Sequence, residues 1–148
     1  MFSSILTVCT GNICRSPLAE YLLRARLERV SAKVSSAGIK ALVDQPADAL
    51  AQQIAQSHGL DLRPHLGRQI EKKILEEHEL ILVMEDRHRD YIRSHFPQVS
   101  GKVFLLGKWE EEKQIPDPYK MSSDFFKEVY DQIDRSVTHW VNRMNGAH

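Results

Sequence analysis

The stretch from Cys9 to Pro17, CTGNICRSP, constrains this chain more than any other segment. The short run 5–9 before it is mostly apolar and β-branched, and apolar residues recur at helical spacing after it. This order predicts a buried strand, a tight loop and the N-terminus of a helix. The N–H groups of such a loop and the positive end of the helix dipole converge on one point. The sequence therefore predicts an anion-binding site between the strand and the helix.

Strand-like and helix-like segments alternate along the rest of the chain. We expect strands at 5–9, 33–37, 80–84 and 102–106. We expect helices from Pro17 to about 31 with Ser16 as the N-cap, from 44–46 to a stop at Gly59, at 70–77, from a cap at Asp86 to His95, and from about 122 to 145.

This alternation predicts the fold class. Strands separated by helices favour an α/β architecture, so we expect a single domain over 1–148 with a four-stranded parallel sheet and helices on both faces. Ligands of such sheets bind beyond the carboxyl ends of the strands. The loop that follows Cys9 would emerge there.

Charge and composition exclude several classes of function. The chain has 20 basic and 20 acidic residues, so no overall basic field would hold nucleic acid or an anionic membrane. The N-terminus has no basic region before its short apolar run, so we expect neither a signal peptide nor direct membrane insertion. Two cysteines in one short stretch form no disulfide framework. We therefore expect a cytoplasmic protein whose cysteines are thiols.

The loop residues favour phosphate chemistry. Cys9 and Arg15 lie six positions apart, a spacing that by itself has little specificity, but here a strand precedes it and a helix follows it. A helix N-terminus, converging amides and a nearby cation favour the thiolate, which is the nucleophilic form of cysteine. The planar fork of an arginine matches two oxygens of a phosphoryl group. We expect Cys9 to attack phosphorus; the alternative is a buried, unreactive cysteine.

Attack on a phosphate ester also needs a proton donor for the leaving oxygen. Asp117 is the best candidate, because Pro116 and Pro118 stiffen the backbone on both sides of it. An Asp-Pro pair alone is more often an ordinary turn. The sequence also leaves two roles open for Ser16, which could donate its hydroxyl to the thiolate or only cap the helix.

Segments along nearly the whole chain resemble the low-molecular-weight protein tyrosine phosphatases. The main ones are Cys9–Pro17 and Asp117-Pro-Tyr119, and between them 36–38, 46–48, 65–69 and 80–84 resemble family segments in the expected order. The bacterial Wzb-like branch, which acts in capsule and exopolysaccharide export, is the most similar. The segments 38–43, 107–109 and 115–117 carry this closer likeness.

The resemblance implies roles for three catalytic residues. Cys9 would be the nucleophile that becomes a phosphocysteine, and Arg15 would hold the phosphoryl group. Asp117 would protonate the tyrosyl oxygen and then, as a base, activate the water that hydrolyses the intermediate. The implied fold is a four-stranded parallel sheet with helices on both sides, and the family uses no metal or organic cofactor.

The resemblance also implies a binding loop, its supports and a cleft. The phosphate-binding loop comprises Thr10, Gly11, Asn12, Ile13, Cys14, Arg15 and Ser16. Asn12 would shape this loop from within, with Ser16, Ser36 and His65 as supports. Leu42 and Tyr119 would form the walls of the substrate cleft.

Two departures from the eukaryotic pattern fit the bacterial branch. Leu42 replaces an aromatic residue, and a Tyr-Tyr doublet is here Tyr119-Lys120. The implied substrate is a phosphotyrosine protein, namely the tyrosine-rich tail of a membrane tyrosine autokinase. We expect the enzyme to be a monomer.

Cys14 lies in the same tight loop as Cys9, so a disulfide between them is sterically conceivable and would protect the nucleophile from overoxidation. The alternative is that Cys14 only fills apolar space.

Three competing functions remain to be compared with this interpretation. Arsenate reductases share this fold and loop in one family, but their chemistry needs further cysteines to relay a disulfide, and the chain has none beyond Cys14. A phosphate-binding or phosphotyrosine-reading module that has lost catalysis would need neither a thiolate nor an acid, so the set Cys9, Arg15 and Asp117 argues against it. A metal site is disfavoured because the spacing of the two cysteines is wrong and no histidines cluster with them.

Overall fold

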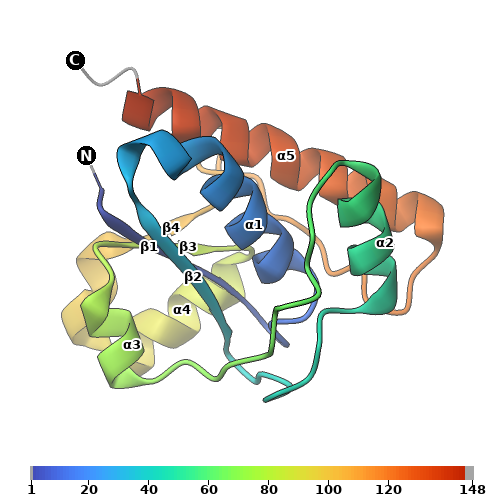
Figure 1. Cartoon of the computed structure of the whole chain (residues 1–148). Coiled ribbons are helices and arrows are strands. Elements are labelled where there is room, and N and C mark those ends of the chain that lie inside the picture. The colour runs from blue at the N-terminus through green and yellow to red at the C-terminus, as the bar shows by residue number, and fades with distance from the viewer. Residues whose placement is uncertain (1, 146–148) are drawn as a thin grey trace.

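The computed structural model of the chain describes residues 2–145 and contains one four-stranded parallel sheet (Figure 1). The strands are β1 (Ser4–Cys9), β2 (Lys33–Gly38), β3 (Leu80–Val83) and β4 (Val103–Leu105). Their order is β2-β1-β3-β4, and every neighbouring pair is parallel. The four predicted strands and the α/β fold class are confirmed.

Helices cover both faces of this sheet (Figure 1). They are α1 (Arg15–Leu27), α2 (Ala49–Ser57), α3 (Lys72–Glu77), α4 (Asp86–His95) and α5 (Ser123–Asn145), with short 3-10 helices at Glu28–Val30 and Pro97–Lys102. Residues of α1, α2 and α5 share one apolar cluster, and residues of α3 and α4 belong to a second. Among residues 2–145, no helix combines the length and apolar character that crossing a membrane would need.

The central strand β1 contributes to both clusters. Ile5 and Cys9 pack in the cluster under α1 and α5, whereas Leu6 and Val8 pack in the other. This alternation follows from the two-residue period of a strand. Burial on both faces explains why this strand is almost uniformly apolar. β1 therefore delivers Cys9 to the middle of the carboxyl edge of the sheet.

The helix that follows the loop begins earlier than predicted. α1 starts at Arg15 with Cys14 in the N-cap position, so the prediction that Ser16 caps this helix is wrong. The Ser16 hydroxyl lies 3.0 Å from Cys9 Sγ and accepts a hydrogen bond from Asn12 Nδ2 at 2.8 Å. Its hydroxyl is thus directed into the loop, and the first turn of the helix is left without a side-chain cap.

The start of α2 also differs from the prediction. The helix begins at Ala49, where the Asp48 carboxylate accepts from two amides of the first turn, and not at 44–46. Residues 44–46 instead pair with a later segment. The Asp44 amide donates to the Gly67 carbonyl at 2.9 Å, and the Gly67 amide donates to the Gln45 carbonyl at 2.8 Å. Asp44 lies in a turn with a φ of 63°, so the helix cannot begin there.

Gly67 itself is required for this pairing, because a Cβ at this position would overlap the Leu42 carbonyl oxygen. The predicted stop at Gly59 is confirmed: the residue has a φ of 80° directly after the C-cap of α2.

The cap of α4 is one residue earlier than predicted. Glu85, and not Asp86, occupies the N-cap position, where its side chain and that of His88 form a reciprocal capping box. Asp86 is the first helical residue, and its carboxylate pairs with Arg89 at 2.9 Å.

Candidate active site

Cys9 is the last residue of β1, and the loop 10–14 carries the chain from there to the start of α1. The Cys9 side chain is only 2% exposed, so its sulfur lies at the base of the site. The strand, loop and helix predicted from the sequence are all present.

The carbonyl groups of this loop point outward. The carbonyls of residues 9, 10 and 11 accept hydrogen bonds from the amides of Ile39, Lys40 and Leu42 at 3.0, 2.9 and 3.0 Å. The carbonyl of residue 12 accepts from His65 Nε2 at 2.6 Å, and that of residue 13 accepts from the Asp48 amide at 2.8 Å. In a trans peptide the N–H points away from the C=O. The following N–H groups therefore face the concave side of the loop, and that of Asn12 lies 3.3 Å from Cys9 Sγ. Such a ring of amides is an anion-binding site.

Asn12 shapes the loop from within. Its φ of 60° lies in the left-handed region, which asparagine tolerates better than most residues. Its Nδ2 donates to Ser16 Oγ at 2.8 Å and to Ser36 Oγ at 2.9 Å, and its Oδ1 accepts from the Arg68 amide at 2.9 Å. The structure thus places Ser16, Ser36 and His65 around Asn12. Because Ser16 Oγ accepts from Asn12, its own proton is available to Cys9 Sγ.

A buried carboxylate continues this network behind the loop. Ser36 Oγ donates to Glu20 Oε1 at 2.6 Å, and Arg24 pairs with Glu20 Oε2 at 2.5 Å. Sequence reasoning missed Glu20. The available signal was a lone acidic residue among the apolar residues of the first helix, one turn after Ser16.

Gly38 lets the next strand approach the loop closely. A Cβ at this position would lie 2.6 Å from the Thr10 carbonyl oxygen. The close approach allows the amides of Ile39 and Lys40 to reach the loop carbonyls.

Arg15 is almost fully buried beside the loop, with 1% of its side chain exposed. Its Nη1 donates to Glu85 Oε2 at 2.5 Å and to the Ile115 carbonyl at 2.7 Å. Its Nη2 lies 3.8 Å from Asp117 Oδ2. The guanidinium therefore connects the loop to two segments that are distant in the sequence.

Glu85 is a second residue that sequence reasoning missed. Burial alone would raise the pKa of this carboxyl, but hydrogen bonds from Arg87 and Arg15 outweigh burial and hold the pKa at about 2. Glu85 is consequently ionised near neutral pH. One carboxylate thus serves two guanidinium groups.

His88 is held in its neutral form next to this cluster. Burial and the positive charge of Arg15 lower the pKa of His88 to about 3. Its Nδ1 accepts from the Glu85 amide at 3.1 Å, so its Nε2 carries the proton and donates to Thr10 Oγ1 at 2.9 Å. Arg87 Nη2 donates to the same Thr10 oxygen at 2.9 Å. Nothing in the sequence alone links these residues to the loop.

A pocket of about 210 Å³ opens over Cys9. It is lined by Cys9, Thr10, Gly11, Ile13, Cys14, Arg15, Lys40, Leu42, Asp117 and Tyr119. The predicted acid and both predicted cleft walls therefore meet the loop in one cavity. Asp117 is half-exposed at the mouth, where its Oδ1 accepts from the Tyr119 amide at 3.0 Å. Lys40 also lines the pocket, which sequence reasoning did not anticipate.

Cys14 lies in the same pocket, and burial raises the pKa of its thiol well above the ordinary value. Both cysteines are free thiols. The pocket combines a buried sulfur, converging amides, a guanidinium and a carboxylate, which are the groups needed to transfer a phosphoryl group through a cysteine.

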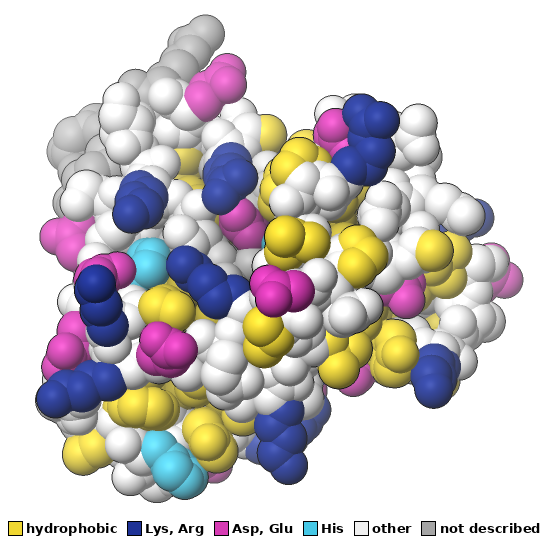
Figure 2. All heavy atoms as spheres, turned by 60° about the horizontal axis from the view of Figure 1, so that its bottom comes forward, with side chains coloured by type: hydrophobic (Ala, Val, Ile, Leu, Met, Phe, Trp, Pro, Cys, Tyr) yellow, Lys and Arg dark blue, Asp and Glu magenta, His cyan; other side chains and the backbone are white. Residues whose placement is uncertain are grey.

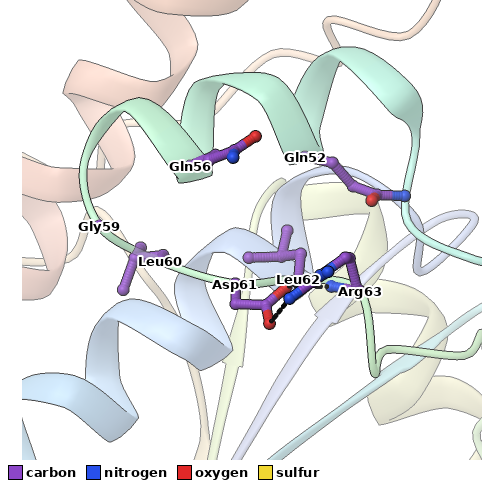
Figure 3. Close-up of a pocket in the computed structure, with 7 residues that line it drawn as sticks. All are labelled: Gln52, Gln56, Gly59, Leu60, Asp61, Leu62 and Arg63. Atoms are coloured by element: carbon purple, nitrogen blue, oxygen red, sulfur yellow. Dashed lines mark hydrogen bonds and ion pairs between the residues drawn. The ribbon is translucent and has the colours of Figure 1, made fainter.

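A hollow of about 500 Å³ lies elsewhere, beside α2 (Figure 3). It is lined by Gln52, Gln56, Gly59, Leu60, Asp61, Leu62 and Arg63. Its charged side chains, Asp61 and Arg63, are bound to each other at 2.9 Å. Its lining residues include no cysteine, serine or histidine, so the smaller pocket is the better candidate for chemistry. No group of three or more metal-ligating side chains occurs in the described part of the chain.

Comparison with known proteins gives the family. The family model described as "Low molecular weight phosphotyrosine protein phosphatase" matches residues 4–147. The chain belongs to this family. As a low molecular weight phosphotyrosine protein phosphatase it is a phosphoric monoester hydrolase, so the predicted family and enzyme class are confirmed.

Individual relatives agree over almost their whole length. The phosphatase Etp of Escherichia coli K12 is 47% identical over 144 residues, which are 97% of this chain and 96% of Etp. The crystal structure of the tyrosine phosphatase Wzb from Escherichia coli K30 has a TM-score of 0.93 at 43% identity and covers 97% of this chain and 99% of Wzb. The crystal structure of the tyrosine phosphatase AmsI from Erwinia amylovora has a TM-score of 0.91 at 44% identity and covers 96% of this chain and 93% of AmsI. None of these relatives favours a reductase or a binding module.

Proposed function

We propose that this phosphatase hydrolyses phosphotyrosine in proteins through a phosphocysteine intermediate formed on Cys9. The observation that carries the proposal is the pocket in which Cys9 lies at the base, Arg15 at the side and Asp117 at the mouth. The tyrosine phosphatase Wzb from Escherichia coli K30 forms complexes with sulphate and with phosphate, and a tetrahedral oxyanion of this kind is what the pocket would bind.

In the first step the Cys9 thiolate attacks phosphorus while the loop amides bind the phosphoryl oxygens. The bond between phosphorus and the tyrosyl oxygen breaks, and the leaving oxygen takes a proton from Asp117. Arg15 Nη1 is bound to Glu85 and the Ile115 carbonyl, which fixes the plane of the guanidinium. Its remaining N–H groups would then bind phosphoryl oxygens.

In the second step a water molecule attacks the phosphocysteine, and the Asp117 carboxylate takes the proton of this water. The sulfur leaves as a thiolate, which the Asn12 amide and the Ser16 hydroxyl stabilise by hydrogen bonding. Both donors are held in place before the reaction, so little reorganisation is needed when the negative charge develops.

The cleft walls would select the substrate. Leu42 and Tyr119 line the pocket and are 44% and 41% exposed, so their apolar surfaces are available to the phenol ring. On the resemblance to the Wzb-like branch, we propose that the substrate is the tyrosine-rich tail of a membrane tyrosine autokinase in capsule or exopolysaccharide export. The enzyme would act on it in the cytoplasm as a monomer.

Cys14 would protect the nucleophile. Peroxide would oxidise the Cys9 thiolate to a sulfenic acid, which condenses with the Cys14 thiol to give a disulfide and water. A thiol reductant would restore both cysteines. If, after peroxide treatment, a thiol reductant restored the activity of Cys14→Ser as fully as that of the parent, this protective role would be wrong.

Hydrolysis of p-nitrophenyl phosphate tests the mechanism. Cys9→Ser should be inactive, because a serine hydroxyl at this site would stay protonated. Cys14→Ser, which removes the other thiol of the loop, should keep measurable turnover. Rapid quenching of the parent should trap one phosphoryl group on Cys9, identified by mass spectrometry. Full activity of Cys9→Ser would overturn the mechanism.

A further inference from the structure

Basic side chains surround the mouth of the pocket, although the chain as a whole has no net charge. Lys40 lines the pocket, Arg87 contacts Thr10, and Lys120 Nζ lies 5.4 Å from the centre of the Tyr119 ring. All three basic side chains are exposed. Figure 2 shows the face at the bottom of Figure 1, where basic side chains lie among exposed hydrophobic and acidic ones.

Arg87 is held in position by its neighbours. Its Nε and Nη2 donate to the two oxygens of Glu85 at 3.2 and 3.0 Å, and Nη2 also donates to Thr10 Oγ1. Its Nη1 has no hydrogen-bond partner among residues 2–145, and 57% of the side chain is exposed. A guanidinium fixed in this way loses little freedom on binding a carboxylate.

The Arg87 charge is only partly neutralised. Its partner Glu85 is shared with Arg15, and the other carboxylate of the site, Asp117, lies 3.8 Å from Arg15 Nη2. With Lys40, three cationic side chains stand against these two carboxylates. His88, which packs against the Glu85 carboxylate, is neutral because burial and Arg15 lower its pKa. An incoming anion at the rim would therefore meet net positive charge.

Lys40 reaches the same part of the rim from the other segment. Its amide donates to the Thr10 carbonyl at 2.9 Å, and Lys40, which is exposed, is one of the residues that line the pocket. It makes no ion pair with any described residue between 2 and 145. Lys40, in the segment after β2, thus contacts Thr10 through its backbone amide, and Arg87, in α4, contacts Thr10 through its guanidinium.

We infer that Arg87 and Lys40 form a docking surface for acidic residues that flank the phosphotyrosine of a substrate protein. The inference rests on the proposed function, because the phosphotyrosine must occupy the Cys9 pocket for its neighbours to reach the rim. Charge complementarity selects the occupant: an acidic, phosphotyrosine-containing segment. Rim charges of this kind act mainly on association, and salt screens them over about 8 Å at physiological ionic strength.

Three phosphotyrosine peptides of equal length test this surface on the wild-type enzyme. They carry Asp and Glu, the matched Asn and Gln, or Lys on both sides of the phosphotyrosine. We expect kcat/KM to be about three- to tenfold higher for the acidic peptide than for the amide peptide, and lowest for the lysine peptide. The differences should shrink at about 0.5 M salt. Equal kcat/KM values for the three peptides would overturn the inference.

Variants then assign the preference to the two cations. The Lys40→Gln, Arg87→Gln double variant should lose the preference for the acidic peptide. Arg87→Lys keeps the charge but not the bidentate fork, so it should retain most of the preference. Lys73→Gln is the matched control, because Lys73 is an exposed lysine on α3 with 84% of its side chain exposed. A preference that persists in the double variant, or that disappears in Lys73→Gln, would contradict the assignment.

p-Nitrophenyl phosphate separates this inference from the proposed function, because it has no flanking residues. If the wild type hydrolyses it and Cys9→Ser does not, equal rates on the peptides overturn the docking surface alone. If hydrolysis does not depend on Cys9, both the mechanism and the docking surface are wrong.

Discussion

The rear and the mouth of the phosphate loop are built in different ways. At the rear, Asn12, Ser36 and His65 are buried and hold the loop through hydrogen bonds with short, defined distances. At the mouth, Arg87 and Asp117 are exposed, and charge dominates their contacts. The two sides meet in the same few loop residues.

This difference separates shape from reactivity. A buried hydrogen bond that loses its partner costs about 1–3 kcal/mol, whereas an exposed ion pair contributes about 0–1 kcal/mol. The rear therefore fixes the shape of the loop over a wide range of conditions. The mouth can respond to pH, salt and the charge of the substrate without a change in that shape.

The largest expected effect belongs to the mouth and concerns catalysis alone. Asp117→Ala should lower kcat by about 10²- to 10⁴-fold and change KM far less, because the leaving oxygen loses its proton donor. The free energy of unfolding should hardly change, since this side chain is 45% exposed. Steady-state kinetics and urea unfolding measure the two quantities. Asp61→Ala, which removes another exposed carboxylate, is the control. If Asp117→Ala changed only KM, the expected difference between the mouth and the rear would be wrong.

A rear substitution should instead act on stability. Asn12→Ala removes the partner of Ser36, Ser16 and the Arg68 amide and leaves alanine at a positive φ. We expect the free energy of unfolding to fall by about 3 kcal/mol, which corresponds to a Tm lower by roughly 6–12 °C. Calorimetry measures this shift. The control Asn142→Ala changes an exposed asparagine of α5 and should leave Tm nearly unchanged.

Glu85 connects the two sides and gives a test by pH. Its pKa is about 2 in the folded protein and about 4.5 when unfolded, so its ion pairs stabilise the fold above pH 4.5. This contribution is lost as the pH falls from 4.5 toward 2. Solvent screens this partly exposed side chain, so we discount the full effect of the pKa change and expect Glu85→Gln to be less stable than the parent by about 2 kcal/mol at pH 7. Most of this difference should be lost at pH 2.

Urea unfolding of both proteins at several pH values measures the Glu85 effect. Glu77→Gln, an exposed carboxylate on α3, should show no such trend. A difference between Glu85→Gln and the parent that stays constant from pH 7 to pH 2 would contradict the ion-pair interpretation.

The smallest expected effect is that of Thr10→Val. The change removes the acceptor of His88 Nε2 and Arg87 Nη2 at nearly constant volume. Arg87 is exposed and can bind water, so only the buried His88 donor loses its partner. We expect the free energy of unfolding to fall by about 1 kcal/mol. A loss above about 3 kcal/mol, measured by urea unfolding, would mean that the mouth is built like the rear.

The sequence predicts local features of the site well. The order of apolar strand, polar loop and helix located the Cys9 loop, and the proline-flanked Asp117 was selected from the chemical need for an acid. Both depend on short stretches of chain. The structure places them in one pocket with Leu42 and Tyr119, two residues selected from the resemblance.

Features set by tertiary contacts were missed or misplaced. Ser16 resembles an N-cap in sequence, but its hydroxyl bonds within the loop. The helix predicted from 44–46 starts later, because the backbone there pairs with Gly67. Glu85 and Arg87 appear to sequence reasoning as ordinary charged helix-start residues, since their partners lie about 70 positions away. No local pattern encodes such contacts.

The outward-pointing carbonyls of the loop have a consequence for the order of folding. Their hydrogen-bond partners come from residues 39–42, from 48 and from 65. Arg15 also binds the Ile115 carbonyl, which lies 100 positions later in the chain. A chain emerges from the ribosome with its N-terminus first. Cys9 would therefore be exposed to the cell long before the loop could bind phosphate. Catalytic competence should emerge late in synthesis, so incomplete chains would not compete for phosphoproteins.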